Sequence, residues 1–511
     1  MLARATTFVL DAFDARRVTV EVDVSRGLPN FLIGGLGDAA VRESRERVRI
    51  ALRNAGFDFP DRRITVNLAP ASLRKRGSGF DLAIALAILA ASGQLPAAAV
   101  EDLAVYGELS LGGEVRGCRG TLAVAEAAAH HGLSAFLVAA DRAPEARLVE
   151  ELRVVAVARL RDAVCVLSGE QSVDAPIVDV APPPSTSRHE PDLADIRGHR
   201  VAIAAACTAA AGGHNLLLSG PPGTGKTMLA RRLPGILPPL TRREAIEVTR
   251  IQSLTGLREG GGLIERRPFR APHHGISASG LVGGGARPAP GEATLAHHGI
   301  LFLDELAEFS RSALDALRQP MEDGRAAIVR GQLSAVFPSR FTLVAAMNPC
   351  PCGYAGVEGR CRCSPAAIEG YARRLSGPLI DRIDVLVDMH RPSGEDLAGA
   401  PFTTSAAARE RVLAARERQQ FRLAGSSATC NAQMAPGLVR EHVRLDPTGE
   451  RILEHAYSKG QLSARGRERA LKVARTIADM AGRDRVHPGD VAQALSLRKE
   501  HVARDAESQA A

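Results

Sequence analysis

The sequence predicts an α/β protein in which a three-layer core, with a parallel sheet between layers of helices, is followed by a C-terminal helical lid. Three observations predict this fold class. The apolar run Asn215–Leu218 is followed by a glycine-rich loop and a helical segment, which is a strand–loop–helix order. Four apolar residues precede Asp304, as in a strand buried on both faces. The chain after about Ser405 has helical patterning.

The N-terminal residues 1–169 alternate short strands with helices, which indicates a separate α+β domain. Val18–Val24 alternates apolar and polar residues, as a half-buried strand does. Val41–Ala55 has helical spacing and ends at Gly56. The further elements expected here are strands at Ile64–Leu68 and Ala135–Ala139, helices at Phe80–Ala91 and Thr121–His131, and a hairpin that begins at Leu103.

Composition marks the remaining domain boundaries. Residues 170–193 are rich in proline, serine and aspartate, so we expect a linker that packs no core. Residues 194–400 are expected to form the α/β core, and residues 401–511 the helical lid. The lid helices are expected at Ala406–Phe421, Arg440–Lys459, Ala464–Gly482 and Pro488–His501.

Charge and cysteine content limit the class of protein. The formal net charge is +8, which permits an anionic partner such as nucleic acid without requiring one. No apolar run has the length that spans a bilayer, and the N-terminal apolar patch meets Asp11 and Asp14 too early for a signal peptide. We therefore expect a cytoplasmic protein with no membrane association. In that compartment the eight cysteines are not a disulfide framework.

The glycine-rich loop reads GPPGTGKT and predicts a phosphate-binding site. Its glycines allow the backbone to fold tightly, so that successive N–H groups surround phosphate oxygens. Lys226 would reach the β- and γ-phosphates of ATP, and the Thr227 hydroxyl would hold Mg²⁺. The predicted nucleotide-binding residues are Gly220, Pro221, Pro222, Gly223, Thr224, Gly225, Lys226 and Thr227.

Two further strand ends supply groups that ATP hydrolysis requires. Asp304 would bind Mg²⁺ through water, and Glu305 would polarise the attacking water. The strand Phe341–Met347 ends at Asn348, whose amide can hydrogen-bond both the γ-phosphate and the attacking water. The alternative for the acidic pair is a buried strand that ends in solvated acids, and the glycine-rich loop argues against it.

Four of the cysteines form a tight group of two Cys-x-Cys pairs that follows Asn348. Four thiolates can close a tetrahedral site, which is the ligand set of a structural Zn²⁺. The Cys-x-Cys spacing is less usual than Cys-x-x-Cys, so free thiols and a redox switch remain as alternatives. The candidate zinc ligands are Cys350, Cys352, Cys361 and Cys363.

The N-terminal domain resembles a Lon-protease-like domain in two stretches, KRGSGFDLAIALAIL and GELSLGGEVRGCRG. The proteolytic dyad of that family does not carry over. Gly79 stands where the family places its nucleophilic serine, with Ser78 one position early, and Leu122 stands where it places the lysine. A serine without its base is a weak nucleophile, so we expect a scaffold without protease activity.

Together the motifs cover nearly the whole chain and resemble the ComM/YifB family of magnesium-chelatase-like AAA+ ATPases. They are GPPGTGKT, LDEL, MNPCPCG, DRID and LSARGRERALKVARTIADM, behind the Lon-like domain. The resemblance implies a homo-oligomer, a hexameric ATP-driven motor that moves on single-stranded or branched DNA. It also implies that the motor promotes branch migration of recombination intermediates during natural transformation. The alternative function is a chelatase-type motor that remodels a protein partner.

Two arginines have catalytic roles that this resemblance implies. Arg382, in the DRID motif, stands where such proteins carry an arginine finger that acts on the nucleotide of the next subunit. The alternative is a surface arginine paired with Asp381 or Asp384. Arg465 resembles the sensor 2 arginine of the lid, and Arg467 competes with it for that role.

The expected DNA contacts lie in two segments of the core. The glycine-rich segment Gln252–His298 resembles a helix-2 insert that projects toward the pore of a ring, and Arg270 within it could contact phosphates. The segment 324–338 resembles a presensor 1 hairpin, in which Arg330 either contacts DNA or is an ordinary solvated arginine. The pair His273–His274 has no further metal ligand nearby in the sequence, and we expect it to pack in the pore.

Overall fold

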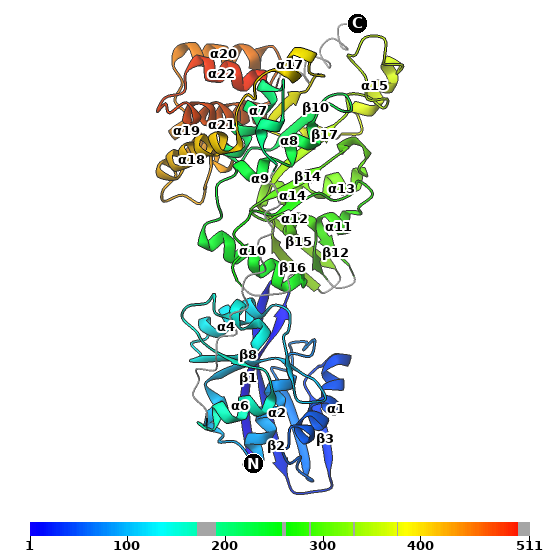
Figure 1. Ribbon diagram of the computed structural model, residues 1–511, viewed down its shortest axis with the longest axis vertical. Coiled ribbons are helices and arrows are strands. Elements are labelled where there is room, and N and C mark those ends of the chain that lie inside the picture. The colour runs from blue at the N-terminus through cyan, green and yellow to red at the C-terminus, as the bar shows by residue number, and fades with distance from the viewer. Residues whose placement is uncertain (171–190, 258–261, 286–287, 331–332, 376, 499–511) are drawn as a thin grey trace. The chain divides into compact units, whose positions relative to one another are not determined.

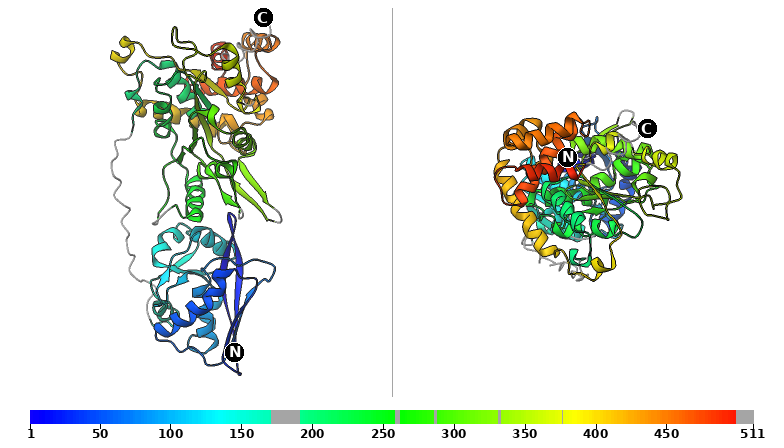
Figure 2. Two further views of the ribbon diagram at one scale, coloured as in Figure 1. Left: turned by 90° about the vertical axis from the view of Figure 1, so that its right-hand side faces the viewer. Right: turned by 90° about the horizontal axis from the view of Figure 1, so that it is seen from above.

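The structure is a computed structural model, and its described residues divide into two units (Figures 1 and 2). Unit 1 lies within Met1–Thr186 and Arg242–Ile264, and unit 2 within Ser187–Thr241 and Glu265–Ala511. Residues 171–190, which make up most of the expected linker, lie outside the described residues. The structure describes residues 1–170, 191–257, 262–285, 288–330, 333–375 and 377–498.

Unit 1 is built on a seven-stranded sheet in the order β3-β4-β2-β1-β5-β8-β9. β1 and β2 form an antiparallel hairpin, and β2 also pairs antiparallel with β4. The parallel neighbours are β1 with β5, β5 with β8, β8 with β9, and β3 with β4. The valines at alternate positions of β2 are buried, as the alternation in the sequence predicts. The strands are β1 (Leu2–Asp11), β2 (Asp14–Ser25), β3 (Asn30–Gly34), β4 (Arg63–Ala69), β5 (Leu103–Tyr106), β8 (Ala135–Ala139) and β9 (Arg153–Val157), with a small hairpin of β6 (Glu108–Leu109) and β7 (Val115–Arg116).

Helices cover both faces of this sheet. After Asp81 at its first position, α2 is apolar to its end, and all of its residues are buried, as expected of a helix that is enclosed on every side. It shares one core with α1 and α6, whereas α4 and α5 contribute to a second core. The helices are α1 (Ala39–Asn54), α2 (Asp81–Ala91), α3 (Ala98–Glu101), α4 (Thr121–His130), α5 (Ala143–Ala146) and α6 (Leu160–Leu167).

Unit 1 also includes α10 (Arg242–Thr255), which comes from the middle of the chain and packs on α4. The Ser253 hydroxyl donates a hydrogen bond to the buried Glu145 carboxylate, which also accepts one from the backbone N–H of Leu122 at 2.8 Å. The expected core at 194–400 is therefore interrupted here, because an amphipathic helix buries its apolar side on whichever surface complements it. The apolar residues that α10 buries are Ala245, Val248 and Ile251.

The ring of Tyr106 fills the place of the protease nucleophile that the Lon resemblance predicts. A Cβ atom built on Gly79 would lie 2.3 Å from Cε2 of Tyr106, so no serine fits there without a shift of the ring. The Ser78 hydroxyl instead donates to the Glu108 carboxylate. Leu122 is fully buried among apolar side chains, where the family places its lysine. This packing supports the expectation of a scaffold without protease activity.

Unit 2 is built on a five-stranded parallel sheet in the order β11-β14-β17-β10-β18. Alternate residues of β10 face opposite sides: Leu216 and Leu218 join one core, and Leu217 joins the other. All four residues of β14 are buried, which confirms the prediction of a strand covered on both faces. The strands are β10 (Leu216–Ser219), β11 (Phe269–Arg270), β14 (Ile300–Leu303), β17 (Thr342–Met347) and β18 (Val385–Asp388).

Helices and small hairpins surround this sheet. β15 (Arg325–Arg330) and β16 (Leu333–Pro338) pair as the antiparallel hairpin that the sequence predicts, and the hairpin extends away from the sheet (Figures 1 and 2). The remaining elements of the core are α7 (Arg200–Gly212), α8 (Lys226–Ala230), α9 (Leu233–Ile236), α11 (Ala278–Val282), β12 (Gly283–Gly284), β13 (Ala289–Pro290), α12 (Glu292–Leu295), α13 (Arg311–Ala316), α14 (Arg318–Asp323), α15 (Pro365–Ala372), α16 (Gly377–Ile380) and α17 (Gly394–Ala398).

The C-terminal helices form the lid, in which α18 and α21 pack on α7. The lid lies on one side of the core, and the segment that leads into α15 lies on the opposite side (Figures 1 and 2). None of the described helices is both long and apolar enough to span a bilayer. The lid helices are α18 (Ser405–Arg422), α19 (Pro436–His442), α20 (Pro447–Ser458), α21 (Ala464–Met480) and α22 (Pro488–Ser496).

The prediction of one helix at Arg440–Lys459 is wrong, because α19 ends at His442 and α20 begins at Pro447. Proline has no N–H to donate and is favoured at the first position of a helix. The Asp446 carboxylate accepts from the backbone N–H of Gly449 at 2.7 Å and caps the new helix. The last helix ends at Ser496, and the expected end at His501 lies outside the described residues.

We predict that Gly79→Ser destabilises the protein by about 1–3 kcal/mol, the range of core overpacking, without creating a protease. Urea unfolding would measure the first effect and casein degradation the second. Ser78→Ala is the matched control, and it should change stability by no more than about 1 kcal/mol. Casein degradation by Gly79→Ser would contradict the interpretation of this domain.

Candidate active site

The carboxyl ends of β10, β17 and β14 meet at one edge of the sheet, since the three strands are parallel neighbours. The segment Gly220–Gly225 leaves β10, and Lys226 and Thr227 begin α8. The Lys226 ammonium donates to the carbonyl oxygens of Gly220 and Pro221, at 2.6 and 2.9 Å, and to Oδ1 of Asn348 at 3.2 Å. Burial lowers the pKa of Lys226, and the Asp304 carboxylate works against that shift. The structure thus brings the predicted lysine and amide into direct contact.

The hydroxyl of Thr227 donates to Oδ2 of Asp304 at 2.8 Å. Oδ1 of the same carboxylate accepts from the backbone N–H of Glu305 at 3.0 Å. A hydroxyl and a carboxylate are hard oxygen ligands of the kind that Mg²⁺ prefers, and their separation allows both to act on one cation. These contacts fit the predicted site for Mg²⁺ and nucleotide, in which a bound Mg²⁺ would neutralise phosphate charge.

Glu305 has an unusual backbone conformation and a partner that the sequence does not indicate. Its φ of 54° lies in the left-handed region, which costs a non-glycine residue of the order of 1 kcal/mol. Its Oε2 lies 3.3 Å from Nδ1 of His274. Sequence reasoning placed His274 in a pore and missed this contact. The missing signal was the strand β11: Arg270 pairs with Leu301, so residues four positions beyond each, His274 and Glu305, come side by side.

Arg382 is largely buried in its own subunit. Its guanidinium forms an ion pair with Glu322 on α14 and donates to the carbonyl of Pro378 at 2.6 Å. The sequence analysis gave Asp381 or Asp384 as an alternative ion-pair partner of Arg382, whereas in the structure the partner is Glu322. The role of Arg382 as an arginine finger for a neighbouring subunit stays a prediction.

Asp384 joins the core to the lid through a buried network. Its carboxylate accepts from the backbone N–H of Asn215 at 3.0 Å and from the Arg469 guanidinium at 2.6 Å, and His214 Nδ1 lies 3.6 Å away. Burial by itself would raise the pKa of this carboxyl, but the His214 ring and the Arg469 charge outweigh it and lower the pKa. Arg498 donates to the carbonyl of Ile383 at 3.0 Å. The lid therefore holds the segment that carries Arg382.

The two candidate sensor 2 residues, Arg465 and Arg467, lie exposed in the first turn of α21. The structure leaves the choice between them open. The arginine of α21 that reaches the core is Arg469, which donates to the carbonyl of Arg382 as well as to Asp384. Sequence reasoning missed it, because helical periodicity shows which face an arginine occupies and not which strand that face meets.

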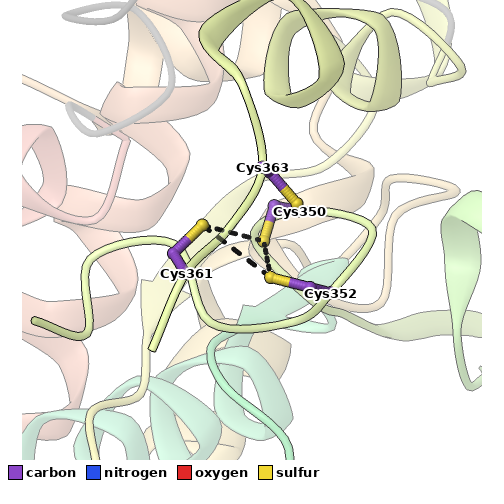
Figure 3. Close-up of side chains that lie close together, drawn as sticks. All are labelled: Cys350, Cys352, Cys361 and Cys363. Atoms are coloured by element: carbon purple, nitrogen blue, oxygen red, sulfur yellow. Dashed lines mark hydrogen bonds between the residues drawn. The ribbon is translucent and has the colours of Figure 1, made fainter. Parts of the chain in front are cut away.

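The four predicted cysteines lie together in the loop between β17 and α15 (Figure 3). Their sulfur atoms all lie within 4.8 Å of one another. Sγ of Cys350 lies 3.4 Å from that of Cys352 and 3.9 Å from that of Cys361, and Cys352 and Cys361 are 3.8 Å apart. The backbone N–H groups of Tyr354 and Arg362 lower the pKa of Cys352 to about 6, while the pKa values of Cys361 and Cys363 are raised within the same cluster, so these interactions favour a thiolate at Cys352.

This cysteine loop touches the nucleotide-binding loop. Gly353 has a φ of 85°, and a Cβ built on it would lie 2.9 Å from Cδ of Pro222 and 3.8 Å from the amide carbon of Asn348. Only glycine permits both the left-handed backbone and so close an approach. A change in the conformation of the cysteine loop would therefore reach the phosphate-binding residues directly.

The two predicted DNA contacts differ in their surroundings. The Arg270 guanidinium forms a two-pronged ion pair with Glu292, at 2.6 and 2.8 Å, and is half-buried. Arg330 lies exposed at the end of β15, beside the exposed side chain of Val329. Neither arrangement tests the prediction, so both residues stay predicted contacts.

Comparisons with known proteins cover both units. The family described as "Magnesium chelatase, subunit ChlI" matches residues 192–397, "Subunit ChlI of Mg-chelatase" matches residues 20–142, and "Magnesium chelatase, subunit ChlI C-terminal" matches residues 403–498. The competence protein ComM of Haemophilus influenzae is 44% identical over 486 residues, which cover 94% of each chain. This chain belongs to the ComM/YifB family of magnesium-chelatase-like AAA+ proteins.

Other members of the ComM/YifB family align over a similar length. YifB of Escherichia coli is 42% identical over 489 residues, 95% of this chain and 94% of its own. Rv2897c of Mycobacterium tuberculosis is 43% identical over 500 residues, 98% of this chain and 99% of its own. Membership of this family indicates an ATPase that uses ATP and Mg²⁺, and the contacts of Lys226, Thr227, Asp304 and Asn348 are arranged for that chemistry.

We predict that Asp384→Asn destabilises the protein by about 2 kcal/mol near neutral pH, because it removes the buried carboxylate that pairs with the partly buried Arg469 charge. Urea unfolding near pH 7 would measure the loss. Asp381→Asn, in the same motif and only half-buried, is the control and should have little effect.

The loss of stability in Asp384→Asn relative to the wild type should depend on pH. The folded-state pKa of Asp384 lies below its ordinary value, so its contribution is present above the unfolded pKa and is lost as the pH falls below it. The difference in stability between the wild type and Asp384→Asn should therefore shrink below about pH 4. A difference that is constant down to about pH 3 would contradict the ionised state assigned to Asp384.

Proposed function

We propose that this protein is a ring-forming ATPase that translocates on single-stranded or branched DNA and promotes branch migration of recombination intermediates during natural transformation. The observation that carries the proposal is the assembly of Lys226, Asn348, Thr227 and Asp304 at one sheet edge, in a chain 44% identical to a competence protein over 94% of both lengths. DNA as the substrate would place the activity in the cytoplasm.

The residues have distinct roles in the proposed reaction. The loop N–H groups and Lys226 would bind the phosphates, and Thr227 and Asp304 would hold Mg²⁺, which would neutralise phosphate charge. Glu305 accepts a proton from the attacking water, and Asn348 orients that water against the γ-phosphate. Arg382 of an adjacent subunit stabilises the charge that develops on the γ-phosphate, which would require a homo-oligomer, and we propose a hexamer.

The β15–β16 hairpin supports the assignment of DNA as the track. It extends from the sheet and carries exposed Arg325 and Arg330, together with Val329, whose side chain is 74% exposed. Arginine binds phosphates irrespective of base sequence. A motor that moves along DNA of any sequence needs contacts of this kind.

We predict that steady-state ATP hydrolysis rises several-fold with single-stranded or four-way-junction DNA, and that Glu305→Gln abolishes it. Loss of the general base should lower kcat by about 100-fold or more. Arg330→Ala should reduce the stimulation by DNA and leave the rate without DNA unchanged. Arg311→Ala, an exposed arginine of α13, is the matched control.

An ATPase rate that no DNA changes would contradict the translocase proposal. It would favour the second candidate, a chelatase-type motor that remodels a protein partner, which the family descriptions covering residues 192–397 and 403–498 support. The same assay in the presence of candidate protein partners would then identify the client.

We further propose that Cys350, Cys352, Cys361 and Cys363 hold a structural Zn²⁺. Zinc–sulfur bonds of about 2.3 Å place the sulfurs of a tetrahedral site about 3.8 Å apart. The distances between Sγ atoms of 3.4, 3.8 and 3.9 Å fit that geometry. The backbone N–H of Ala355 also donates to Sγ of Cys350 at 3.2 Å, which fixes the position of that sulfur.

We predict that the purified protein contains zinc in an equimolar amount by elemental analysis, and that Cys350→Ser and Cys363→Ser lose it. Cys165→Ser, outside the cluster, is the control and should retain the metal. Two results together would contradict this site. The protein would contain no zinc after expression in zinc-supplemented medium, and the four cysteines of the cluster would react with a thiol reagent.

A further inference from the structure

Two arginines lie in the cysteine loop, which spans residues 348–364 between β17 and α15. They are Arg360 and Arg362, and both are exposed. The loop holds one acidic residue, Glu358, which is also exposed. None of the three forms an ion pair with another residue that the structure describes. By contrast, both arginines that follow α15 form ion pairs with glutamates. The loop therefore presents two guanidinium charges that the protein itself leaves uncompensated.

The backbone of the loop is fixed by successive turns. The Gly353 N–H donates to the carbonyl of Cys350 at 2.9 Å, and the Val357 N–H donates to that of Tyr354 at 3.0 Å. The N–H of Arg360 donates to the carbonyl of Val357 at 3.3 Å. The Arg360 guanidinium carbon also lies 5.7 Å from the centroid of the Tyr354 ring, which is within the range of a cation–π contact. Both ends of Arg360 are therefore oriented by the loop.

The cysteine cluster fixes the second arginine. Arg362 lies between Cys361 and Cys363, two of the four cysteines whose sulfur atoms lie within 4.8 Å of one another (Figure 3). The backbone N–H of Arg362 interacts with Sγ of Cys352. The exposed guanidinium of Arg362 is thus carried by a backbone that the cluster holds in place.

The chemistry of this surface favours a phosphate ligand. A guanidinium is always charged, and its planar fork of N–H donors matches the oxygen atoms of a phosphate. A protein partner would instead need apolar or aromatic anchors at the centre of the interface. Residues 348–364, all of which the structure describes, expose no large apolar side chain. A nucleic-acid backbone therefore fits the loop better than a protein surface does.

We propose that Arg360 and Arg362 form a second nucleic-acid contact, separate from the β15–β16 hairpin, in which each guanidinium binds a phosphate of the DNA backbone. The proposal rests on the proposed function for the identity of the ligand. Contacts with phosphates are independent of base sequence, as a motor that moves along DNA requires. The loop begins at Asn348, and its Gly353 touches Pro222. DNA bound to the loop therefore acts next to the residues that would hold the phosphates of ATP.

The test is binding of a fluorescently labelled single-stranded oligonucleotide to the full chain, measured by anisotropy over a range of salt concentrations. Each phosphate contact with a single strand contributes about 0.7 to the slope of log K against log salt concentration. The double variant Arg360→Ala, Arg362→Ala should therefore lose about 1.4 of this slope and bind about 25-fold more weakly at 0.1 M salt. Arg451→Ala, an exposed arginine of the lid helix α20, is the control and should change neither quantity.

An affinity and a slope equal to those of the wild type would overturn the proposal. Weaker binding with an unchanged slope would overturn it as well, because the slope reports the number of phosphate contacts. The variant Arg360→Lys, Arg362→Lys keeps both charges and should keep the slope. Zinc content and binding of a fluorescent ATP analogue, both equal to those of the wild type, would show that the cysteine loop is intact in each variant.

Arginine footprinting tests the contact in the unaltered protein, so it does not depend on the folding of a variant. Phenylglyoxal modifies accessible guanidinium groups, and mass spectrometry measures the extent at each residue. The oligonucleotide should protect Arg360 and Arg362 and leave Arg451 as reactive as in the free protein. Equal modification of Arg360 and Arg362 with and without the oligonucleotide would contradict the contact.

Failure of the proposed function gives a different result. If the wild type binds the oligonucleotide through these arginines and no DNA changes its ATPase rate, the translocase proposal fails and the contact stands. If DNA stimulates the wild type and the double variant binds as tightly as the wild type, the contact fails and the translocase proposal stands. A wild type that binds no nucleic acid overturns both.

Discussion

Parallel pairing of β14, β17 and β10 is the constraint on which the active site depends. Parallel neighbours bring their carboxyl ends to the same edge, so a residue just beyond each strand reaches a common point. Lys226, Asp304 and Asn348 are far apart in the sequence and meet within hydrogen-bond distance of the same loop for this reason. The same register extends to β11 and brings His274 beside Glu305. A shift of one residue in any of these pairings would separate the groups.

A second constraint acts on the opposite end of this sheet. Asp384 is buried, and its charge is compensated by the Arg469 guanidinium and the Asn215 backbone N–H. The carboxylate therefore fixes the start of β10, the segment that carries Arg382 and the lid helix α21 relative to one another. Buried ion pairs contribute little net stability, but removal of one partner is costly. The network specifies the position of the lid, and with it the positions of Arg382 and of the first turn of α21.

Side-chain packing supports the interpretation of the N-terminal unit as a scaffold without protease activity. Its Lon-like motifs alone leave open whether a displaced serine has taken over as a nucleophile. The Tyr106 ring occupies the space beside Gly79, Ser78 is directed to Glu108, and Leu122 belongs to the apolar core. α10 completes this unit, and the Glu145 carboxylate links it to α4. The chain passes from unit 2 into unit 1 and back before it reaches β11.

The sequence by itself determined the local elements and the residue types that the candidate site brings together. Period-two alternation predicts β2, a run of apolar residues predicts β14, and the spacing of GPPGTGKT predicts a phosphate-binding loop, because each depends on neighbours along the chain. The sequence analysis predicted one helix where α19 and α20 are separate, although a proline inside a helical pattern indicates a break. Only the tertiary structure decided what meets across the fold: His274 with Glu305, Arg469 with Asp384, Arg382 with Glu322, and α10 with α4. These pairings depend on strand order and on which helix face meets which surface, and one sequence carries no local signal for either.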